Sequence, residues 1–398
     1  MKAHFHWLLQ EYSWIILVFV SIACSNINSS NSNEFTLSGK IINQDTGKIT
    51  LRYVLNYEII LDTVEIRKGD FKFKGVIPEP TRATLNGGDE QNNTELYIEP
   101  GFIKITLTKD NFKDFKITGS KSSEEELALR AIESPIFNQM ELVRQKLFKL
   151  EDSLEKLNNV IEQKTLTREI EYLRNQWAQI STTLHGAQLT FIKANPKSFP
   201  AMNRLSILGQ YLSLDSLKTY YYGMDTLVQN GKDGIILKDD IRRLENTIVG
   251  AVAPNFIAID LKGDTISLSK FKGAKVVLLE FWSSYCFPCR KSFSFLMNLF
   301  QKYHPKGFEI IAISCDLSKK AWISAVEKDE ISLWHNVPVA EKNIPGQIKS
   351  TDIKANYYIY GVPLQLLIDK NGIIIGKWTS KSKVNDEALA EKLSEILQ

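Results

Sequence analysis

Residues 275–290 read KVVLLEFWSSYCFPCR, an apolar run that ends in two cysteines separated by two residues. The continuous apolar segment Lys275 to Phe281 is typical of a strand that is buried on both faces of a central sheet. A helix is predicted to follow, from about Cys289 to Tyr303. The pair Cys286 and Cys289 therefore stands where a buried strand ends and a helix begins, and in that context the spacing indicates a redox pair.

The position of the pair at a helix start predicts a different role for each sulfur. Backbone N–H groups and the helix dipole stabilise a thiolate there and lower the pKa of the first cysteine below its free value of about 8.5. We expect Cys286 to be the attacking nucleophile. Cys289, one turn into the helix and less exposed, is placed to attack the mixed disulfide and release the product.

Strands and helices alternate on both sides of the cysteine pair. The turn Lys262-Gly263 joins the two strands of a predicted hairpin. The further predicted elements are strands at 308–314, 365–368 and 373–378 and helices at 319–330 and from Asp386. This order predicts an α/β domain with a mixed sheet over residues 249–398.

Residues 35–119 show a different pattern, in which apolar and polar residues alternate over short runs that Gly and Asn separate. Runs at 35–41, 49–54, 59–66 and 71–74 have the period of two that strands require, so we expect an antiparallel β-sandwich or meander. The segment holds no cluster of His, Asp, Glu or Cys that would form a catalytic site.

Helix is predicted for residues 120–248. The run Ser122 to Glu126 places a Glu three residues after a Ser, which is the capping-box pattern that opens a helix. Apolar residues then recur at three-then-four spacing on each side of a break at Gln163 to Thr165. The spacing fits two antiparallel helices packed within the chain, which we favour because each run covers only about three heptads, and it also fits a coiled coil that forms a homodimer.

The first residues, 1–24, have the character of an export signal. The apolar run from Trp14 ends near Cys24 and is shorter than the roughly 20 residues that a membrane-spanning helix needs. A cysteine after small residues resembles the lipidation site of bacterial lipoproteins, in which Cys24 becomes the acylated N-terminus. An ordinary cleaved signal peptide is the alternative. Residues 25–34 are mostly Ser and Asn and are expected to form a flexible tether.

Composition excludes several other functions. The formal charge of +3 is spread over 398 residues with no basic stripe, so nucleic acid is not an expected partner. A structural zinc site requires four ligands. Beside the cysteine pair the candidate ligands are Cys315, His304 and His335, which lack paired spacing, so no metal and no other cofactor is expected. Once Cys24 is assigned to lipidation, the remaining cysteines cannot form a disulfide framework. We expect Cys315 to be an inert buried thiol, with a regulatory thiol as the alternative.

The segment 281–290 resembles the active-site segment of the thioredoxin family, and the resemblance extends over residues 249–398. It is closest to the membrane-anchored envelope branch, the TlpA/ResA-like proteins of the AhpC/TSA-related superfamily. Residues 360–363, Tyr-Gly-Val-Pro, resemble the family's cis-proline loop. The resemblance implies a thioredoxin fold, a redox disulfide between Cys286 and Cys289, and a cis peptide bond before the proline of that loop.

The same resemblance assigns roles to single residues. Val362 is expected to pair with the substrate chain, with Pro363 and Trp282 also on the substrate-binding side. Glu280 falls where thioredoxins carry a buried acid that relays the proton of the second cysteine, and in a dry strand its pKa should rise, which suits a general base. The envelope branch often carries a Glu three residues after the second cysteine, where this chain has Ser292.

Residues 35–119 resemble a domain of unknown function that precedes thioredoxin-like domains in many bacterial envelope proteins. The matching stretches are Gly39 to Ile41, Asp62 to Val64 with Gly69 to Gly75, and Glu99 to Gly101.

These resemblances imply a lipoprotein, anchored at a membrane and facing the periplasm, that reduces disulfides of envelope proteins, as in cytochrome c maturation. Its partners would be protein disulfides or dithiols and a membrane electron donor. A thiol peroxidase is one alternative, because Ser283 lies three residues before Cys286 as a Ser or Thr does in peroxiredoxins, although Cys289 argues against it. The other is a binding or scaffold module that carries an accessory redox domain.

Overall fold

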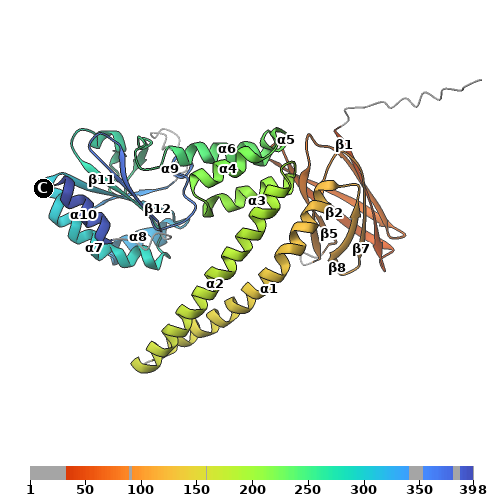
Figure 1. Cartoon of the computed structure of the whole chain (residues 1–398), viewed down its shortest axis with the longest axis horizontal. Helices are drawn as coiled ribbons and strands as arrows, with labels where there is room; N and C mark the ends of the chain where they lie inside the picture. The colour runs from red at the N-terminus through yellow and green to blue at the C-terminus, as the bar shows by residue number, and fades with distance from the viewer. Residues whose placement is uncertain (1–32, 89–91, 158, 340–352, 380–385, 398) are drawn as a thin grey trace, which may run out of the picture.

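The computed structural model of the chain describes residues 33–88, 92–157, 159–339, 353–379 and 386–397. Figure 1 shows an eight-stranded sheet at one end and a five-stranded sheet with its helices at the other, with a group of short helices between them. A hairpin of two long helices projects from this row. The predicted export segment with Cys24 lies outside the described residues, as does the predicted tether up to residue 32.

The first sheet is formed by β1 (Glu34–Ile42), β2 (Thr46–Leu55), β3 (Glu58–Arg67), β4 (Asp70–Val76), β5 (Thr81–Asn86), β6 (Asn93–Ile98), β7 (Gly101–Thr108) and β8 (Asn111–Thr118). The strands lie in the order β6-β5-β2-β3-β4-β1-β7-β8. All neighbours are antiparallel except β1 and β7, which are parallel. Alternate side chains of β1 and β4 are buried, as the period of two predicted.

The structure corrects the expected antiparallel β-sandwich, because all eight strands belong to one sheet. This sheet curls until its edge strands approach each other, where the backbone N–H of Phe112 in β8 donates to Asn92 Oδ1 beside β6 at 3.0 Å. Alternating burial shows only that one face of each strand is covered. A curled sheet and two stacked sheets satisfy that pattern equally well, so the pattern alone could not choose between them.

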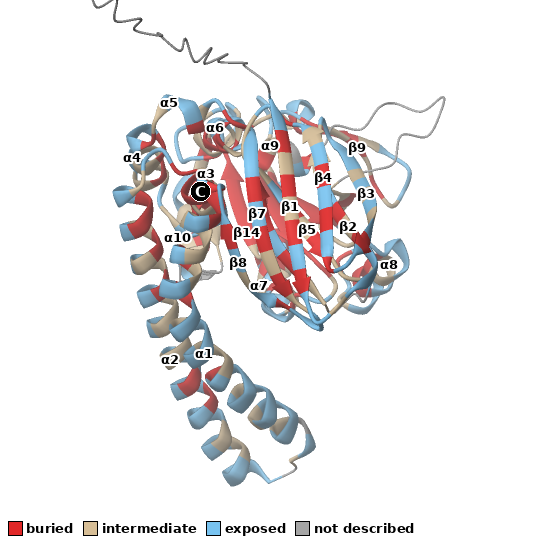
Figure 2. Cartoon of the chain, turned by 90° about the vertical axis from the view of Figure 1, so that its right-hand side faces the viewer, coloured by how far each residue is buried: buried red, intermediate tan, exposed pale blue. Residues whose placement is uncertain are grey.

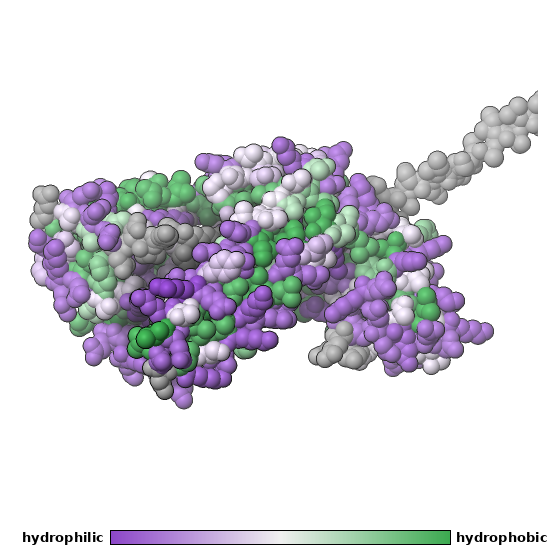
Figure 3. Space-filling view, turned by 60° about the horizontal axis from the view of Figure 1, so that its bottom comes forward, coloured by the Kyte–Doolittle hydropathy of each residue, from purple (hydrophilic) through white to green (hydrophobic). Residues whose placement is uncertain are grey.

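The long helices α1 (Lys121–Lys156) and α2 (Val160–Ala194) form an antiparallel hairpin. Val143, Ile170, Leu173 and Leu184 of the predicted apolar seam are buried, whereas Figure 2 shows the rest of the hairpin to be largely exposed. The two helices therefore pack on each other within one chain, which is the arrangement we favoured, while a homodimer through this region stays a prediction. Figure 3, which brings the lower side of Figure 1 forward, shows hydrophobic surface only in separate areas between hydrophilic side chains.

Two details of the hairpin differ from the prediction. The N-terminus of α1 is capped by Ser120, whose side chain accepts a hydrogen bond from Ser123 N, and not by the predicted capping box. The hydroxyls of Ser120 and Ser123 also bond the backbone of Tyr97 in β6, so contact with the sheet selects this helix start. The break between the helices lies at Asn159, which caps α2, instead of at 163–165.

The short helices pack around a common core that includes Leu205, Leu217, Tyr221 and Leu237. They are α3 (Phe199–Leu208), α4 (Leu214–Gly223), α5 (Thr226–Gln229) and α6 (Lys232–Glu245), with a single 3-10 turn, η1 (Gly209–Tyr211), between α3 and α4. We refer to residues 199–247 as the helical bridge, because they lie between the two sheets (Figure 1).

The second sheet is mixed and has the order β13-β12-β11-β14-β15. Its central strand β11 is buried along its whole length, parallel to β12 and antiparallel to β14. The elements of this part are β9 (Ile257–Ile259), β10 (Thr265–Ser267), β11 (Val276–Trp282), α7 (Phe287–Tyr303), β12 (Phe308–Ser314), α8 (Lys319–Lys328), β13 (His335–Pro338), α9 (Ile353–Tyr357), β14 (Leu364–Ile368), β15 (Ile374–Thr379) and α10 (Asp386–Ile396). A short 3-10 turn, η2 (Leu268–Phe271), follows β10, and another, η3 (His304–Lys306), follows α7.

The sequence predicted this α/β order but missed β13 and α9. Both are short, with four and five residues, and a segment of that length shows no periodicity that could be recognised. In the part of the chain that the structure describes, no helix combines the length and the apolar character that crossing a bilayer requires.

Candidate active site

Cys286 and Cys289 are joined in a disulfide at the start of α7, with their Cα atoms 5.3 Å apart. Cys286 is the N-cap residue of the helix, and its Sγ accepts a hydrogen bond from the backbone N–H of Cys289 at 3.2 Å. The side chain of Cys286 is 7% exposed and that of Cys289 is fully buried. An incoming group can therefore reach only the first sulfur, which sits where helix N–H groups favour negative charge.

The loop that precedes Cys286 is held on two sides. The carboxylate of Asp316 accepts hydrogen bonds from the backbone N–H of Ser284 at 2.9 Å and from its hydroxyl at 2.6 Å. On the other side, Arg290 Nη1 donates to Ser284 O at 3.1 Å, while its guanidinium pairs with Asp329 at 2.6 and 2.8 Å. These contacts fix the approach to the reactive sulfur.

Sequence reasoning missed Asp316, Arg290 and Asp329. Asp316 and Asp329 lie 32 and 39 residues from their partners, and no local pattern connects residues so far apart. Arg290 directly follows the second cysteine, so it was visible as part of the motif, but its partner was not. The ion pair with Asp329 holds the pKa of Arg290 above its ordinary value.

The Val362–Pro363 peptide bond is cis, as the resemblance implied. Pro363 lines a cavity of about 360 Å³ together with Pro288 of the disulfide loop and with Lys291 and Ser292 of α7. The fold therefore brings the cis-proline loop and the Cys-x-x-Cys loop to the same opening, although they lie more than 70 residues apart in the sequence. Val362 and Pro363 are both partly exposed at this place.

Glu280 is fully buried in the middle of β11, where it lies opposite Ala312 of β12 and Gln365 of β14. Its position in a dry strand is the one expected from the sequence, and its role as a base stays a prediction.

Trp282 requires a correction. Its side chain is fully buried and packs edge-on against Phe293 of α7, with ring centroids 5.1 Å apart, so it has no surface to offer a substrate. Trp282 belongs to the core that supports the helix start. The motif placed it next to the site in sequence, but alternation along β11 puts its side chain on the buried face that α7 covers.

Cys315 follows β12 directly and is partly buried, so it is more exposed than the buried thiol we expected. Desolvation nevertheless raises the pKa of its thiol to about 11, and Lys354 offsets this only in part. At neutral pH Cys315 is therefore a protonated, weakly nucleophilic thiol.

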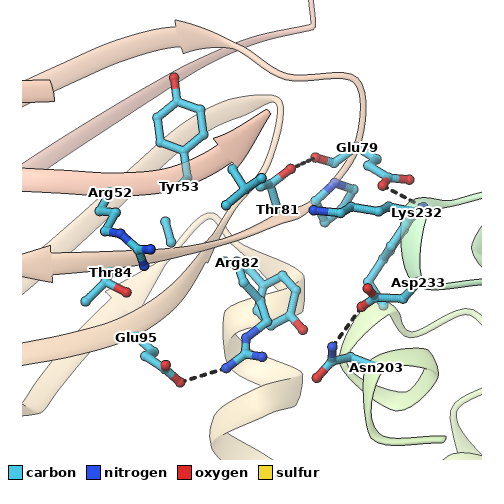
Figure 4. Close-up of a pocket in the computed structure, with 15 residues that line it drawn as sticks. Arg52, Tyr53, Glu79, Thr81, Arg82, Thr84, Glu95, Asn203, Lys232 and Asp233 are labelled. Carbon is cyan, nitrogen blue, oxygen red and sulfur yellow. Dashed lines mark hydrogen bonds and ion pairs between the residues drawn. The ribbon is translucent and has the colours of Figure 1, made fainter. Parts of the chain in front are cut away.

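Among the described residues, no group of three or more His, Cys, Asp or Glu side chains is arranged to hold a metal ion. Another cavity of about 360 Å³ lies where the first sheet meets the helical bridge (Figure 4). On the sheet side of this cavity Arg82 pairs with Glu95 at 3.0 Å, and on the bridge side Asp233 accepts from Asn203 at 2.8 Å. Across the contact, Glu79 accepts the backbone N–H of Lys232 at 2.8 Å. This cavity contains no residue of the disulfide or of the cis-proline loop.

Comparison with known proteins agrees with this arrangement. The AhpC/TSA family profile matches residues 249–383, and that of a domain of unknown function (DUF4369) matches residues 35–126. Thiol-disulfide oxidoreductase ResA of Bacillus thuringiensis subsp. konkukian is 34% identical over 154 residues, which are 39% of this chain and 79% of the relative. ResA of Geobacillus kaustophilus is 34% identical over 138 residues, which are 33% of this chain and 72% of that relative.

Among solved structures, the thioredoxin domain of a thiol-disulfide oxidoreductase from Bacteroides vulgatus is 32% identical, and the match spans 38% of this chain and 99% of that domain with a TM-score of 0.32. A thiol:disulfide interchange protein from Bacteroides sp. is 30% identical over 38% of this chain and 91% of that protein, also with a TM-score of 0.32.

The identity to ResA holds over more than two thirds of the relative's length, and the redox pair, the helix start and the cis-proline loop stand together in the structure. The chain therefore belongs to the ResA-like, thioredoxin-like family of thiol-disulfide oxidoreductases.

Proposed function

We propose that the protein reduces disulfide bonds of other proteins through the dithiol form of Cys286 and Cys289. The observation that carries this proposal is the position of Cys286 as N-cap of α7, with its sulfur accepting the Cys289 N–H and its partner sulfur buried one turn further on. Such a site stabilises one thiolate and keeps a second sulfur within reach of it.

The exchange runs in two steps. The Cys286 thiolate attacks one sulfur of the substrate disulfide, a mixed disulfide forms, and the other substrate sulfur leaves as a thiolate. The Cys289 thiolate then attacks Cys286 Sγ, the bond to the substrate breaks, and the second substrate sulfur leaves. Two electrons pass to the substrate, and the enzyme ends with the disulfide described above, which a dithiol donor must reduce before the next turnover.

Three further residues have proposed roles in these steps. Glu280 accepts the proton of Cys289 when that thiol becomes the attacking group. Val362 offers its backbone to the substrate chain, and Pro363 packs beside the disulfide at the same opening.

We also propose a division of the chain and a location for it. Residues 1–24 direct export, Cys24 carries a lipid that anchors the protein in the periplasm, and 25–34 are the tether. Residues 249–398 carry the redox chemistry, and residues 35–119 and 120–248 present this redox domain to substrates. A membrane electron donor restores the dithiol of Cys286 and Cys289. Incorporation of labelled palmitate that Cys24→Ser abolishes would support the anchor, and unchanged labelling would contradict it.

The central experiment is capture of substrates with Cys289→Ser. This variant lacks the sulfur that releases the mixed disulfide, so partners should accumulate on Cys286 as adducts that a reductant dissolves. Cys286→Ser is the matched control and should capture none. If Cys289→Ser captures no partner either, the proposal of protein disulfide reduction is wrong. The alternative, a binding or scaffold module with an accessory redox domain, would then be favoured. Peroxide consumption without an added dithiol would instead favour a thiol peroxidase.

The direction of electron flow is tested by the redox potential against glutathione. Potentials of related dithiols run from about −270 to about −120 mV. A reductase should lie near the reducing end, and a value near the oxidising end would reverse the proposed direction.

A further inference from the structure

The cavity beside the disulfide continues toward the helical bridge. A neighbouring cavity of about 440 Å³ shares Pro363 and Thr379 with it, so the two cavities adjoin at these residues, and we refer to them together as the groove. The second part is closed on one side by the bridge, with Tyr211, Leu212 and Leu244, and on the other by Pro363 and Leu364. The groove thus runs from Pro288 past the cis-proline to residues that lie outside the redox domain.

The bridge also contacts the cis-proline loop directly. Tyr360 Oη donates to Asp240 Oδ2 of α6 at 3.0 Å, and the rings of Tyr360 and Tyr358 lie 4.2 Å apart. Beside them, Lys377 Nζ donates to Thr247 O at 3.1 Å. The relative position of the bridge and the loop is therefore held by specific bonds, so the far part of the groove has a defined shape.

We propose that this far part is a second substrate subsite, in which the helical bridge binds an apolar side chain of the polypeptide whose disulfide is reduced. The inference rests on the proposed function, since it assigns a substrate preference to the same site. The occupant is a polypeptide segment, because the second cavity adjoins the opening at the disulfide and extends beyond the room that one disulfide needs.

The chemistry of the lining selects an apolar side chain. Leu212 and Leu244 of the bridge are only partly covered by the bridge core and line the cavity together with Leu364 and Pro363. Among the described lining residues Lys377 is the charged one, and its ammonium is already bound to Thr247 O. A charged substrate side chain would lose part of its hydration here, whereas an apolar one gains from burial against Leu212, Leu244 and Leu364.

The test uses two synthetic peptides, each with one cysteine in a disulfide to 2-nitro-5-thiobenzoate, whose release is followed by colour. They differ only in the residues that flank the cysteine, Leu in one and Asp in the other. The full chain, reduced and freed of reductant, should react at least about 10-fold faster with the Leu peptide, since about 1.4 kcal/mol of apolar burial corresponds to a factor of ten.

Leu212→Asp should reduce this preference to about 2-fold or less. Leu212→Lys should reverse the preference in favour of the Asp peptide, which a merely misfolded variant would not do. Leu227→Asp is the matched control, because Leu227 is 61% exposed on α5 and does not line the groove. It should leave the preference unchanged.

The failures are distinguishable. Equal rates for the two peptides in the parent protein, or an undiminished preference in both Leu212 variants, would overturn the subsite and leave the disulfide chemistry intact. Absence of reaction with the peptide-free disulfide of the same reporter would instead overturn the proposed function itself.

Discussion

Two buried glutamates in neighbouring strands allow the proposed proton transfer by Glu280 to be tested against a matched control. Glu280 of β11 is fully buried, and Glu309 of β12 is 5% exposed near the end of the sheet away from the disulfide, where it pairs with Lys275 at 3.7 Å. Glu280→Gln should slow release of the mixed disulfide by about 100-fold at neutral pH, because Cys289 loses its base. The first attack by Cys286 should keep its rate.

Single-turnover quenching, with the mixed disulfide resolved on a non-reducing gel, measures both steps. Glu309→Gln makes the same change in the same sheet and should leave both rates unaltered. If Glu280→Gln resolves the mixed disulfide as fast as Glu309→Gln does, the proton of Cys289 goes elsewhere.

Cys315 should be far less reactive than Cys286. With a pKa of about 11, its thiolate fraction at pH 8 is about 100-fold smaller than that of an ordinary free thiol. In the reduced protein, iodoacetamide should label Cys286 first, and labelling of Cys315 should increase as the pH rises from 9 toward 11. Mass spectrometry of timed samples checks this, and rapid labelling of Cys315 at pH 7 would show a reactive third thiol.

At the scale of elements, three helices meet at one buried acid. Glu133 of α1 is 2% exposed and accepts from Gln188 of α2 at 2.6 Å and from Arg204 of α3 at 3.1 Å. Desolvation raises the pKa of Glu133, whereas the hydrogen bond from Gln188 and the charge of Arg204 oppose this rise and stabilise the carboxylate. The contact ties the hairpin to the helical bridge.

Glu133→Ala should lower the free energy of unfolding by about 3 kcal/mol, because it leaves the mostly buried Arg204 without this partner. Urea unfolding followed by circular dichroism measures the change. Glu141→Ala is the control on the same helix: its pair with Arg144 is exposed, and its removal should not shift the transition. Equal effects of the two substitutions would show that the buried contact does not hold the helices together.

At the scale of the whole molecule, the first sheet is joined to the bridge through a helix end. Glu79, between β4 and β5, accepts at Oε1 the backbone N–H of Lys232 at the start of α6, at 2.8 Å (Figure 4). The side chain thereby caps a helix that belongs to another part of the chain, and this helix also carries Asp240 at the cis-proline loop. One element connects both sheets.

Glu79→Ala should therefore lower the free energy of unfolding by about 1 kcal/mol, as loss of an N-cap does. It should also speed proteolytic cleavage of the chain around residue 231. Glu79→Gln keeps the acceptor oxygen and should lose less. Thermal unfolding and timed limited proteolysis measure the two effects. If Glu79→Ala and Glu79→Gln show the same stability and the same cleavage rate, the hydrogen bond from Lys232 to Glu79 does not hold the sheet to the bridge.

The redox pair and most strands and helices could be predicted from the sequence, because they depend on local patterns. The Cys-x-x-Cys spacing at a strand–helix junction pointed to Cys286 and Cys289, and periods of two and of three-then-four located β1 to β4 and the two long helices. The family resemblance added the cis bond at Pro363.

Only the tertiary structure decided which distant residues meet. The sequence could not show that eight strands form one curled sheet, that Asp316 holds Ser284, or that Trp282 points inward. Nor could it show that the bridge residues Leu212 and Leu244 line a groove shared with the cis-proline loop. Periodicity reports which side of an element is covered, whereas the identity of the covering partner depends on long-range packing that no local pattern records.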